Sequence, residues 1–357
     1  MTHNQKRLRV GVLFGGRSGE HEVSLASASS VIRGLDPDKY EAVPIGISKE
    51  GHWLIGSAVQ KLLPDVLKGG RRVVMTADPT DAALIPLDRS EMGQKLDVVF
   101  PVMHGTYGED GTIQGLLDLA GLPFVGAGVL GSAIGMDKDV AKRLLLQAKI
   151  PVVPWETVYR ADWERDPVSV QKQIEKKFRY PLFVKPAALG SSVGMSKVHS
   201  EKELAPALDL ASEFAMKILV ERAVSAREIE VSVLGNHDPK ASVPGEIVPH
   251  REFYDYTAKY AVGGSDHLTP APIPAAVYER ALDIALRAHR ALGCRGVTRA
   301  DLRYDDTTEE LGELYLLELN TQPGMTPTSL VPDIARHVGI EFDELVAWMV
   351  ENAACDG

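Results

Sequence analysis

The sequence predicts a mixed α/β protein of two or three domains that begins with an open parallel α/β unit. We expect a strand at Leu8–Phe14, a glycine loop at Gly15–Gly19 and a helix at Ala26–Leu35. A strand, a glycine turn and a helix in this order begin a parallel α/β unit. The chain of 357 residues has room for two or three domains of about 150 residues each.

Composition and charge argue against several classes of protein. Apolar residues make up 45% of the chain, and the net charge is −10 without a Lys- or Arg-rich block. This balance argues against nucleic acid or an anionic membrane as the main partner. Cys294 and Cys355 form no metal or redox spacing, and no apolar run approaches the roughly 20 residues of a membrane span. Without a cleavable leader in the first residues, we expect a cytoplasmic protein.

The most informative strand is expected at Tyr315–Asn320. Side chains alternate between the two faces of a strand. Leu317 and Leu319 are therefore expected on one face, and Glu318 and Asn320 on the other. The strand would place a carboxylate and an amide oxygen side by side near its end.

An upstream strand, Val297–Tyr304, is joined to it by a polar link that ends in glycine, which predicts a hairpin. Pairing would bring Asp301 close to Glu318 and Asn320, with Arg299 on the same face. Three hard oxygen donors suit Mg²⁺ that carries phosphate oxygens. The alternative, a surface hairpin with solvated charges, is disfavoured because the neighbouring leucines look buried and buried acids need partners.

Two polar side chains follow predicted parallel strands at the sheet edge where such proteins bind ligands. Glu20 could receive an ammonium group, or it could be a first-turn acid stabilised by the helix dipole. His104 follows the strand Leu96–Met103 and faces the same edge. We do not expect NAD, because the loop is not GxGxxG and the next strand ends at Ser48 rather than at an acid.

Lysines and a small-residue loop indicate phosphate binding. Lys185 ends a predicted strand, and the loop Ala187–Gly194 exposes backbone N–H groups that can fold over phosphates. It is not a Walker loop, since no GK[ST] follows, and a flexible hairpin is the alternative. Lys138 and Lys142 lie one turn apart on a predicted helix, although lysines on a helix are mostly solvated.

Acidic strands and a long loop follow. Glu221 lies near the end of the strand Lys217–Arg222, and Glu228 lies in the next strand, where acidic groups could bind an adenine amino group and a ribose. The irregular stretch Arg251–Pro274 carries several aromatic residues and is typical of a lid or binding loop. Residues 51–92 are interpreted as a peripheral insertion.

Together these features resemble the ATP-grasp superfamily and, more closely, the D-alanine–D-alanine ligase family. The resemblance covers nearly the whole chain apart from about residues 51–92 and the last residues. The matching stretches are Phe14–Ser24, His104–Gly111, Gly135–Lys138, Val184–Pro186, Gly190–Met195, Phe253–Tyr260 and Glu318–Thr326. It implies a Rossmann-like parallel-sheet domain at 1–126 and two α+β domains, at 127–224 and 225–357, that clamp ATP.

The resemblance also implies an activity. ATP would phosphorylate the carboxylate of one D-alanine, and the amine of a second would attack the acyl phosphate. The products would be ADP, phosphate and D-alanyl-D-alanine for peptidoglycan synthesis. The family further implies two Mg²⁺ ions, for which Mn²⁺ can substitute, and often a homodimer.

At the nucleotide end of the site, the resemblance assigns a role to each matching residue. The metal ligands would be Asp301, Glu318 and Asn320. The phosphates would be bound by Lys138, Lys185 and the loop residue Ser191. Adenine and ribose would be held by Glu221, Glu228 and the lid residue Phe253.

At the substrate end, Glu20 would bind the ammonium group of the first D-alanine in a network with Ser191 and Tyr260. His104 would border that substrate. The developing oxyanion would be stabilised by Arg299 and the backbone N–H of Gly324. The carboxylate of the second substrate would be bound by Lys259 and Ser329.

Two other functions remain open at this stage. Another ATP-grasp ligase could join a different acid to a different amine, although Tyr260 favours the dipeptide over a D-lactate ester. A non-catalytic nucleotide-binding protein is the second alternative. It would be expected to lack acids such as Glu318, which is present.

Overall fold

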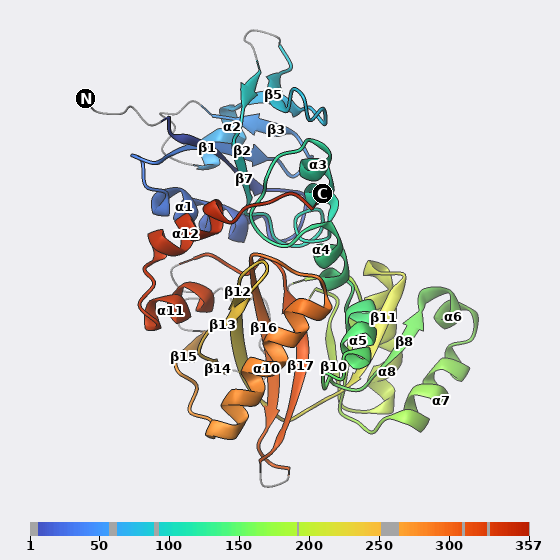
Figure 1. Cartoon of the computed structure of the whole chain (residues 1–357). Helices are drawn as coiled ribbons and strands as arrows, with labels where there is room; N and C mark the ends of the chain where they lie inside the picture. The colour runs from blue at the N-terminus through green and yellow to red at the C-terminus, as the bar shows by residue number, and fades with distance from the viewer. Residues whose placement is uncertain are drawn as a thin grey trace.

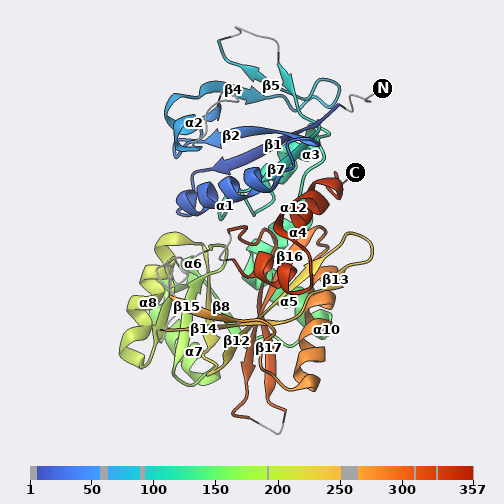
Figure 2. The same cartoon turned by 90° about the vertical axis from the view of Figure 1, so that its left-hand side faces the viewer.

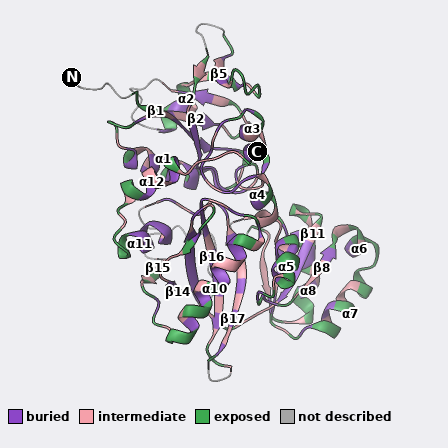
Figure 3. Ribbon diagram, in the orientation of Figure 1, coloured by how far each residue is buried: buried purple, intermediate pink, exposed green. Residues whose placement is uncertain are grey.

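The computed structural model describes residues 6–56, 63–88, 93–190, 193–250, 264–308, 311–326 and 329–356. These residues form three sheets that are covered by helices (Figure 1). The strands of the sheets are largely buried and the outer faces of the helices are exposed (Figure 3). In the described part of the chain, none of the helices has the length and apolar character needed to cross a bilayer.

The first sheet is mixed, with the strand order β6-β5-β4-β3-β2-β1-β7. Its parallel part consists of β1 (Leu8–Gly15), β2 (Tyr40–Ile47) and β7 (Val98–Pro101). Its antiparallel part consists of β3 (Trp53–Ile55), β4 (Arg71–Met75), β5 (Ala83–Pro86) and β6 (Gln94–Lys95). The predicted parallel unit is confirmed for three strands, whereas the four antiparallel strands were not predicted.

Two boundaries in this region differ from the prediction. Residues 51–92 are not an insertion outside the sheet, because they supply β3, β4 and β5 to it. The pattern was missed because these strands are short and separated by Gly, Pro and charged residues. The helix α1 (His21–Gly34) begins before Ala26, directly after Glu20. The other helices here are α2 (Leu63–Gly69), α3 (Thr112–Leu119) and α4 (Val129–Met136).

The second sheet is antiparallel, with the order β10-β9-β11-β8. Its strands are β8 (Trp155–Tyr159), β9 (Leu182–Pro186), β10 (Ser196–Val198) and β11 (Lys217–Arg222). The helices around it are α5 (Lys138–Gln147), α6 (Arg160–Arg165), α7 (Pro167–Lys177) and α8 (Glu201–Phe214). Because β9 and β10 are antiparallel neighbours, the predicted Gly- and Ser-rich loop connects the two strands of a hairpin.

The third sheet has the order β15-β14-β12-β16-β17, and β13 pairs with β12. Its strands are β12 (Arg227–Leu234), β13 (Lys240–Ala241), β14 (Gly245–Pro249), β15 (Ser265–Leu268), β16 (Val297–Asp305) and β17 (Glu313–Asn320). The last helices are α10 (Ala275–Ala291), α11 (Leu330–His337) and α12 (Phe342–Glu351). Of these, α12 packs against α1 of the first domain, so the end of the chain returns to its beginning (Figure 2).

The predicted hairpin of β16 and β17 is confirmed, but its side-chain alternation is not. Asp301 pairs with Glu318 and Leu302 pairs with Leu316, so Leu317 is the extra residue of a β-bulge. Leu316 and Leu319 are the residues that share the buried core, whereas Leu317 lies beside Glu318 along a cleft. The expectation that Leu317 and Leu319 share a face is therefore wrong, because the bulge shifts the alternation by one residue.

The predicted lid contains a β-strand in its second half. Within Arg251–Pro274, the strand β15 pairs antiparallel with β14. Residues 251–263 lie outside the described part of the chain.

Candidate functional site

A cleft of about 1380 Å³, which we call the central cleft, is lined by strand residues of the second and third sheets and by α1 and loop residues that follow strands of the first sheet. All predicted site residues within the described ranges line it. They are Glu20, His104, Lys138, Lys185, Glu221, Glu228, Arg299, Asp301, Glu318, Asn320, Gly324 and Ser329. The other predicted residues, Ser191, Phe253, Lys259 and Tyr260, lie outside the described residues.

The cleft-facing end of the β16–β17 hairpin holds a buried charge network. Arg299 donates from Nε and Nη2 to the two carboxylate oxygens of Asp301, at 2.7 and 2.8 Å. Asn320 donates from Nδ2 to the same carboxylate at 2.8 Å, and Glu230 lies 3.1 Å from Arg299. Burial disfavours the charged guanidinium, but Asp301 and Glu230 outweigh it and raise the pKa of Arg299. Arg299 therefore stays a fixed cation beside the acid pair.

Glu318 faces a lysine from the second domain. Its Oε2 lies 3.2 Å from Nζ of Lys138, and that ammonium also donates to the backbone oxygen of Leu189 at 3.0 Å. Only 13% of the Lys138 side chain is exposed. The alternative that this lysine is a solvated surface residue is therefore wrong. Lys138 thus connects Glu318 of β17 to the loop that follows β9.

The oxygen ligands that the β16–β17 hairpin offers suit a divalent cation that also binds phosphate oxygens. In the described ranges, no group of three or more His, Cys, Asp or Glu is arranged to hold a metal. Asp301, Glu318 and Asn320 instead offer two carboxylates and one amide at adjacent strand positions. Mg²⁺ commonly binds through one or two carboxylates plus substrate phosphate oxygens. The residues thus fit Mg²⁺ that arrives with a nucleotide better than an ion in an all-protein cage.

A buried acid binds two lysines at the opposite wall of the cleft. Glu221 lies 2.6 Å from Nζ of Lys142 and 2.6 Å from Nζ of Lys185. Burial favours the neutral acid, but the two ammonium groups outweigh it and lower the pKa of Glu221. Burial lowers the pKa of Lys142, which also donates to the backbone oxygen of Val153 at 2.8 Å. No role was predicted for Lys142, because its helical spacing from Lys138 was the only signal in the sequence.

Glu228 occupies the next strand along the cleft. Its Oε2 lies 3.1 Å from Nη1 of Arg303, which is its cross-strand partner on β16. The side chain of Glu228 is buried, so the ion pair fixes the direction of its carboxylate.

Glu20 lies where the first domain meets the second. It directly precedes α1, but its side chain does not cap that helix. A Cβ atom placed on Gly105 or Gly190 would lie 2.8 or 2.9 Å from Oε2 of Glu20, so two loops approach this carboxylate with only glycine between. Ser18 donates to the backbone oxygen of His104 at 2.6 Å and so ties the two cleft loops of the first domain together.

His104 forms a buried pair with Glu109, a residue that the sequence did not single out although it lies in the same loop. Nδ1 of His104 is 3.1 Å from Oε1 of Glu109, and Nε2 is 3.3 Å from Oγ of Ser27. Burial disfavours the imidazolium, but the hydrogen bond and charge of Glu109 outweigh it and raise the pKa of His104. Burial also raises the pKa of Glu109, and His104 opposes part of that rise.

Gly324 and Ser329 close the cleft after β17. A Cβ atom on Gly324 would lie 2.9 Å from Oγ of Ser329, so the glycine allows the hydroxyl to approach the backbone. The Ser329 hydroxyl also accepts from the backbone N–H of Thr326 at 3.1 Å. This arrangement places a hydroxyl and a backbone amide at one point of the cleft wall.

Comparison with known proteins identifies the relatives of this chain. Residues 9–127 match the family model described as D-ala D-ala ligase N-terminus, and residues 144–351 match the one described as D-ala D-ala ligase C-terminus. A D-alanine–D-alanine ligase of Natranaerobius thermophilus is 45% identical and covers 97% of this chain and 94% of its own. One from Deinococcus radiodurans is 46% identical, with 97% and 98% covered.

Solved structures of the same kind superpose closely. A D-Ala:D-Ser ligase from Enterococcus faecalis has a TM-score of 0.85 at 35% identity and covers 97% of this chain and 99% of its own. A D-alanine–D-alanine ligase from Coxiella burnetii has a TM-score of 0.84 at 33% identity, with 97% and 93% covered. The architecture is therefore shared over the whole length of the chain.

The His104–Glu109 pair predicts a pH-dependent contribution to stability. A His whose folded pKa lies above the usual value of about 6.5 stabilises the fold fully below that pH. The contribution is lost as the pH rises through the folded pKa. In Glu109→Gln, the largest influence that opposes burial is removed, so we expect the pKa of His104 to fall relative to wild type. Titration of the imidazole by NMR measures this, with His104→Gln to assign the signal. An unchanged His104 pKa in Glu109→Gln would contradict the pairing.

Proposed function

This chain belongs to the D-ala D-ala ligase family, and on that basis we propose that it joins two D-alanine molecules in a reaction that consumes ATP. The product, D-alanyl-D-alanine, would be used in peptidoglycan synthesis. The observation that carries the proposal is the central cleft. It gathers paired acids and a fixed arginine from the third sheet and lysines from α5 and the second sheet at one place.

The chemistry accounts for the need for ATP. A carboxylate is a poor electrophile, so an oxygen of the first D-alanine would attack the γ-phosphorus, and ADP would leave. The amine of the second D-alanine would then attack the carbonyl carbon of the acyl phosphate and form a tetrahedral intermediate. Phosphate would leave as the amide forms, and the amine would lose a proton. The protein contributes mainly position and charge stabilisation to such steps.

We assign the phosphate groups to the side of the cleft formed by Lys138 and Lys185. Lys138 already spans from Glu318 to the loop after β9, so it lies between the acids and that loop. Asp301, Glu318 and Asn320 would hold two Mg²⁺ ions, or Mn²⁺ in their place. When bound, these ions neutralise the charge of the phosphates. Ser191 of the same loop would bind the phosphates as well.

We assign the adenine and ribose to the wall that holds Glu221 and Glu228, with Phe253 covering the base. Both oxygens of Glu221 already lie close to lysines. An ionised carboxylate has about four lone-pair sites, so Glu221 can still accept from an adenine amino group. The fixed direction of Glu228 suits a ribose hydroxyl.

We assign the first D-alanine to the loops around Glu20 and His104. The buried carboxylate of Glu20 would bind the ammonium group, in a hydrogen-bond network with Ser191 and Tyr260. The side chain of His104 would border the same substrate. Two glycine loops approach Glu20 closely, so the substrate would be enclosed by backbone on that side.

We assign the second D-alanine to the end of β17. Arg299 and the backbone N–H of Gly324 would stabilise the oxyanion of the tetrahedral intermediate, because a cation and an amide donor are the groups that such charge requires. Ser329 and Lys259 would bind the carboxylate.

Other parts of the proposal concern the whole molecule. We propose a cytoplasmic homodimer that uses neither nucleic acid nor a membrane as partner. The domain limits that we propose are 1–126, 127–224 and 225–357. The three sheets fall within these limits, which supports the division.

The experiment that tests the function is phosphate release from ATP and Mg²⁺ with single amino acids offered in turn. We expect release that requires D-alanine, with D-alanyl-D-alanine as the product, and no release with L-alanine. D-alanine with D-serine or D-lactate tests the second subsite, because a D-Ala:D-Ser ligase shares this architecture. A mixed product made in preference to D-alanyl-D-alanine would contradict the assignment of the second subsite to D-alanine.

Substitution of Glu318 gives a sharper test of the proposed metal site. We expect Glu318→Gln to lower kcat about 100-fold or more, because it removes one of the two carboxylates proposed to hold Mg²⁺ at the phosphates. The control is Glu313→Gln, the same change at the far end of β17, where the side chain is 43% exposed. Turnover close to wild type in Glu318→Gln would refute the metal site.

A further inference from the structure

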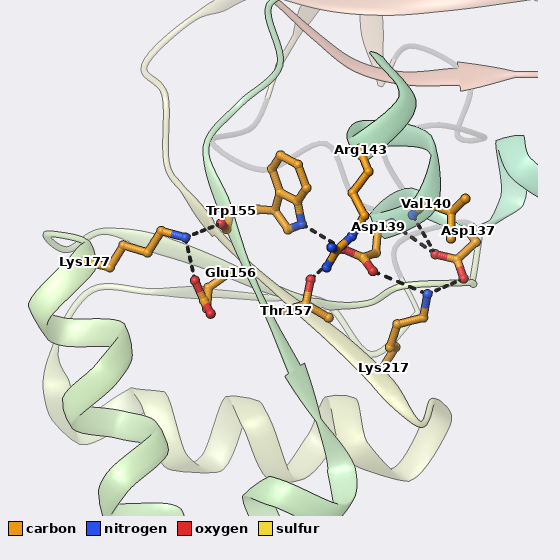
Figure 4. Close-up of polar contacts among 9 residues, drawn as sticks. All are labelled: Asp137, Asp139, Val140, Arg143, Trp155, Glu156, Thr157, Lys177 and Lys217. Carbon is orange, nitrogen blue, oxygen red and sulfur yellow. Dashed lines mark hydrogen bonds and ion pairs between the residues drawn. The ribbon is translucent and has the colours of Figure 1, made fainter. Parts of the chain in front are cut away.

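Asp139 is a buried acid of α5 that lies outside the central cleft. Its carboxylate is 3% exposed, and one oxygen accepts from Thr157 Oγ1 at 2.6 Å, Trp155 Nε1 at 3.0 Å and Arg143 Nε at 3.0 Å. Its other oxygen lies 3.5 Å from Nζ of Lys217. Figure 4 shows side chains of α5, β8 and β11 that converge on this group. Burial opposes ionisation, but the donors outweigh it and lower the pKa of Asp139.

The same region fixes the first turn of α5. Asp137 caps the helix by accepting from the backbone N–H groups of Asp139 and Val140, both at 3.1 Å. Lys217 lies 2.6 Å from the Asp137 carboxylate and also reaches Asp139. The ammonium of a β11 residue therefore bridges the cap and the first turn of the helix.

The same helix carries two lysines that contact acids of the central cleft. Lys138 contacts Glu318, and its backbone N–H donates to the backbone oxygen of Ala187, the first residue of the loop after β9, at 2.9 Å. Lys142 contacts Glu221. The two lysines lie one turn apart and contact acids of the central cleft, while Asp139, which follows Lys138 in sequence, anchors the first turn of the helix to β8 and β11.

A second connection runs through Trp155. The indole N–H of Trp155 donates to Asp139, and Nζ of Lys142 lies 5.2 Å from the centre of the Trp155 ring. Such a cation–π contact favours the ammonium at that place. Asp139 therefore orients the ring against which Lys142 rests.

We propose that Asp139 is a positioning residue for ATP binding, which fixes α5 and Trp155 so that Lys138 and Lys142 remain aligned at the nucleotide side of the cleft. This inference rests on the proposed use of ATP. A neutral amide at this position would keep the size of the side chain. It would bind Lys217 and Arg143 more weakly, because charge-assisted hydrogen bonds are about twice as strong as neutral ones.

The test is calorimetric titration of the full chain with ATP and Mg²⁺ in the absence of D-alanine, together with steady-state kinetics. We expect Asp139→Asn to raise Kd and KM for ATP about tenfold, the size expected for losing hydrogen bonds to a charge. The KM for D-alanine should stay at the wild-type value, because none of the residues assigned to its two subsites contacts Asp139. Trp155→Phe keeps a ring but loses the indole N–H, and a smaller rise in Kd for ATP is expected.

The matched control is Lys177→Met. Lys177 contacts Glu156 at 2.5 Å and the backbone oxygen of Trp155 at 3.0 Å, so the change removes an ion pair from the same strand, away from α5 (Figure 4). We expect its Kd for ATP to equal that of wild type.

The outcomes separate this inference from the proposed function. A wild-type chain that does not bind ATP would overturn the proposed function. The wild-type chain and the Asp139→Asn variant could instead bind ATP with equal affinity, while the variant melts at a lower temperature. That result would show that Asp139 is only structural. If Asp139→Asn does not fold, Thr157→Val removes the shortest of the hydrogen bonds. An unchanged Kd for ATP in that variant would overturn the inference.

Discussion

Pairing of buried charges is the constraint on which the central cleft depends. The guanidinium of Arg299 binds both oxygens of Asp301 on a strand whose other face packs into the core. A buried charge that loses its partner is strongly destabilising, so every acid at these strand ends requires a cation. Glu318 has Lys138 and Glu221 has two lysines. The charges are thereby held in place before a substrate binds, which is the preorganisation that phosphoryl and acyl transfer require.

Much of this arrangement could be predicted because it follows from local pattern. The polar link after β16 predicts a hairpin, and the hairpin brings Asp301 to Glu318. Residues at the carboxyl ends of parallel strands, such as Glu20 and His104, meet at one edge because parallel strands share their direction. The position of Lys185 beside a Gly- and Ser-rich loop likewise follows from sequence order alone.

The rest depends on contacts between segments distant in sequence. The bulge at Leu317 is invisible to an alternating pattern, because one extra residue reverses the faces without a change in composition. The ion pair of Lys142 with Glu221 joins α5 to β11, and no periodicity of the sequence predicts this contact. The strands between residues 51 and 92 were missed because they are short and separated by Gly, Pro and charged residues, although they lie inside the sheet. The anchoring of α5 through Asp139 is a tertiary contact of the same kind.

The central claim is that this cleft activates a carboxylate by transferring phosphate to it, and the fate of the carboxylate oxygen tests it most directly. D-alanine labelled with a heavy oxygen isotope in its carboxylate would be turned over with ATP, and the released phosphate would be analysed by mass spectrometry. The account predicts one labelled oxygen in each phosphate, since the bond from carbon to that oxygen breaks when the amine attacks. Phosphate without the label would show that the carboxylate oxygen was never bonded to the transferred phosphorus, and would contradict the account.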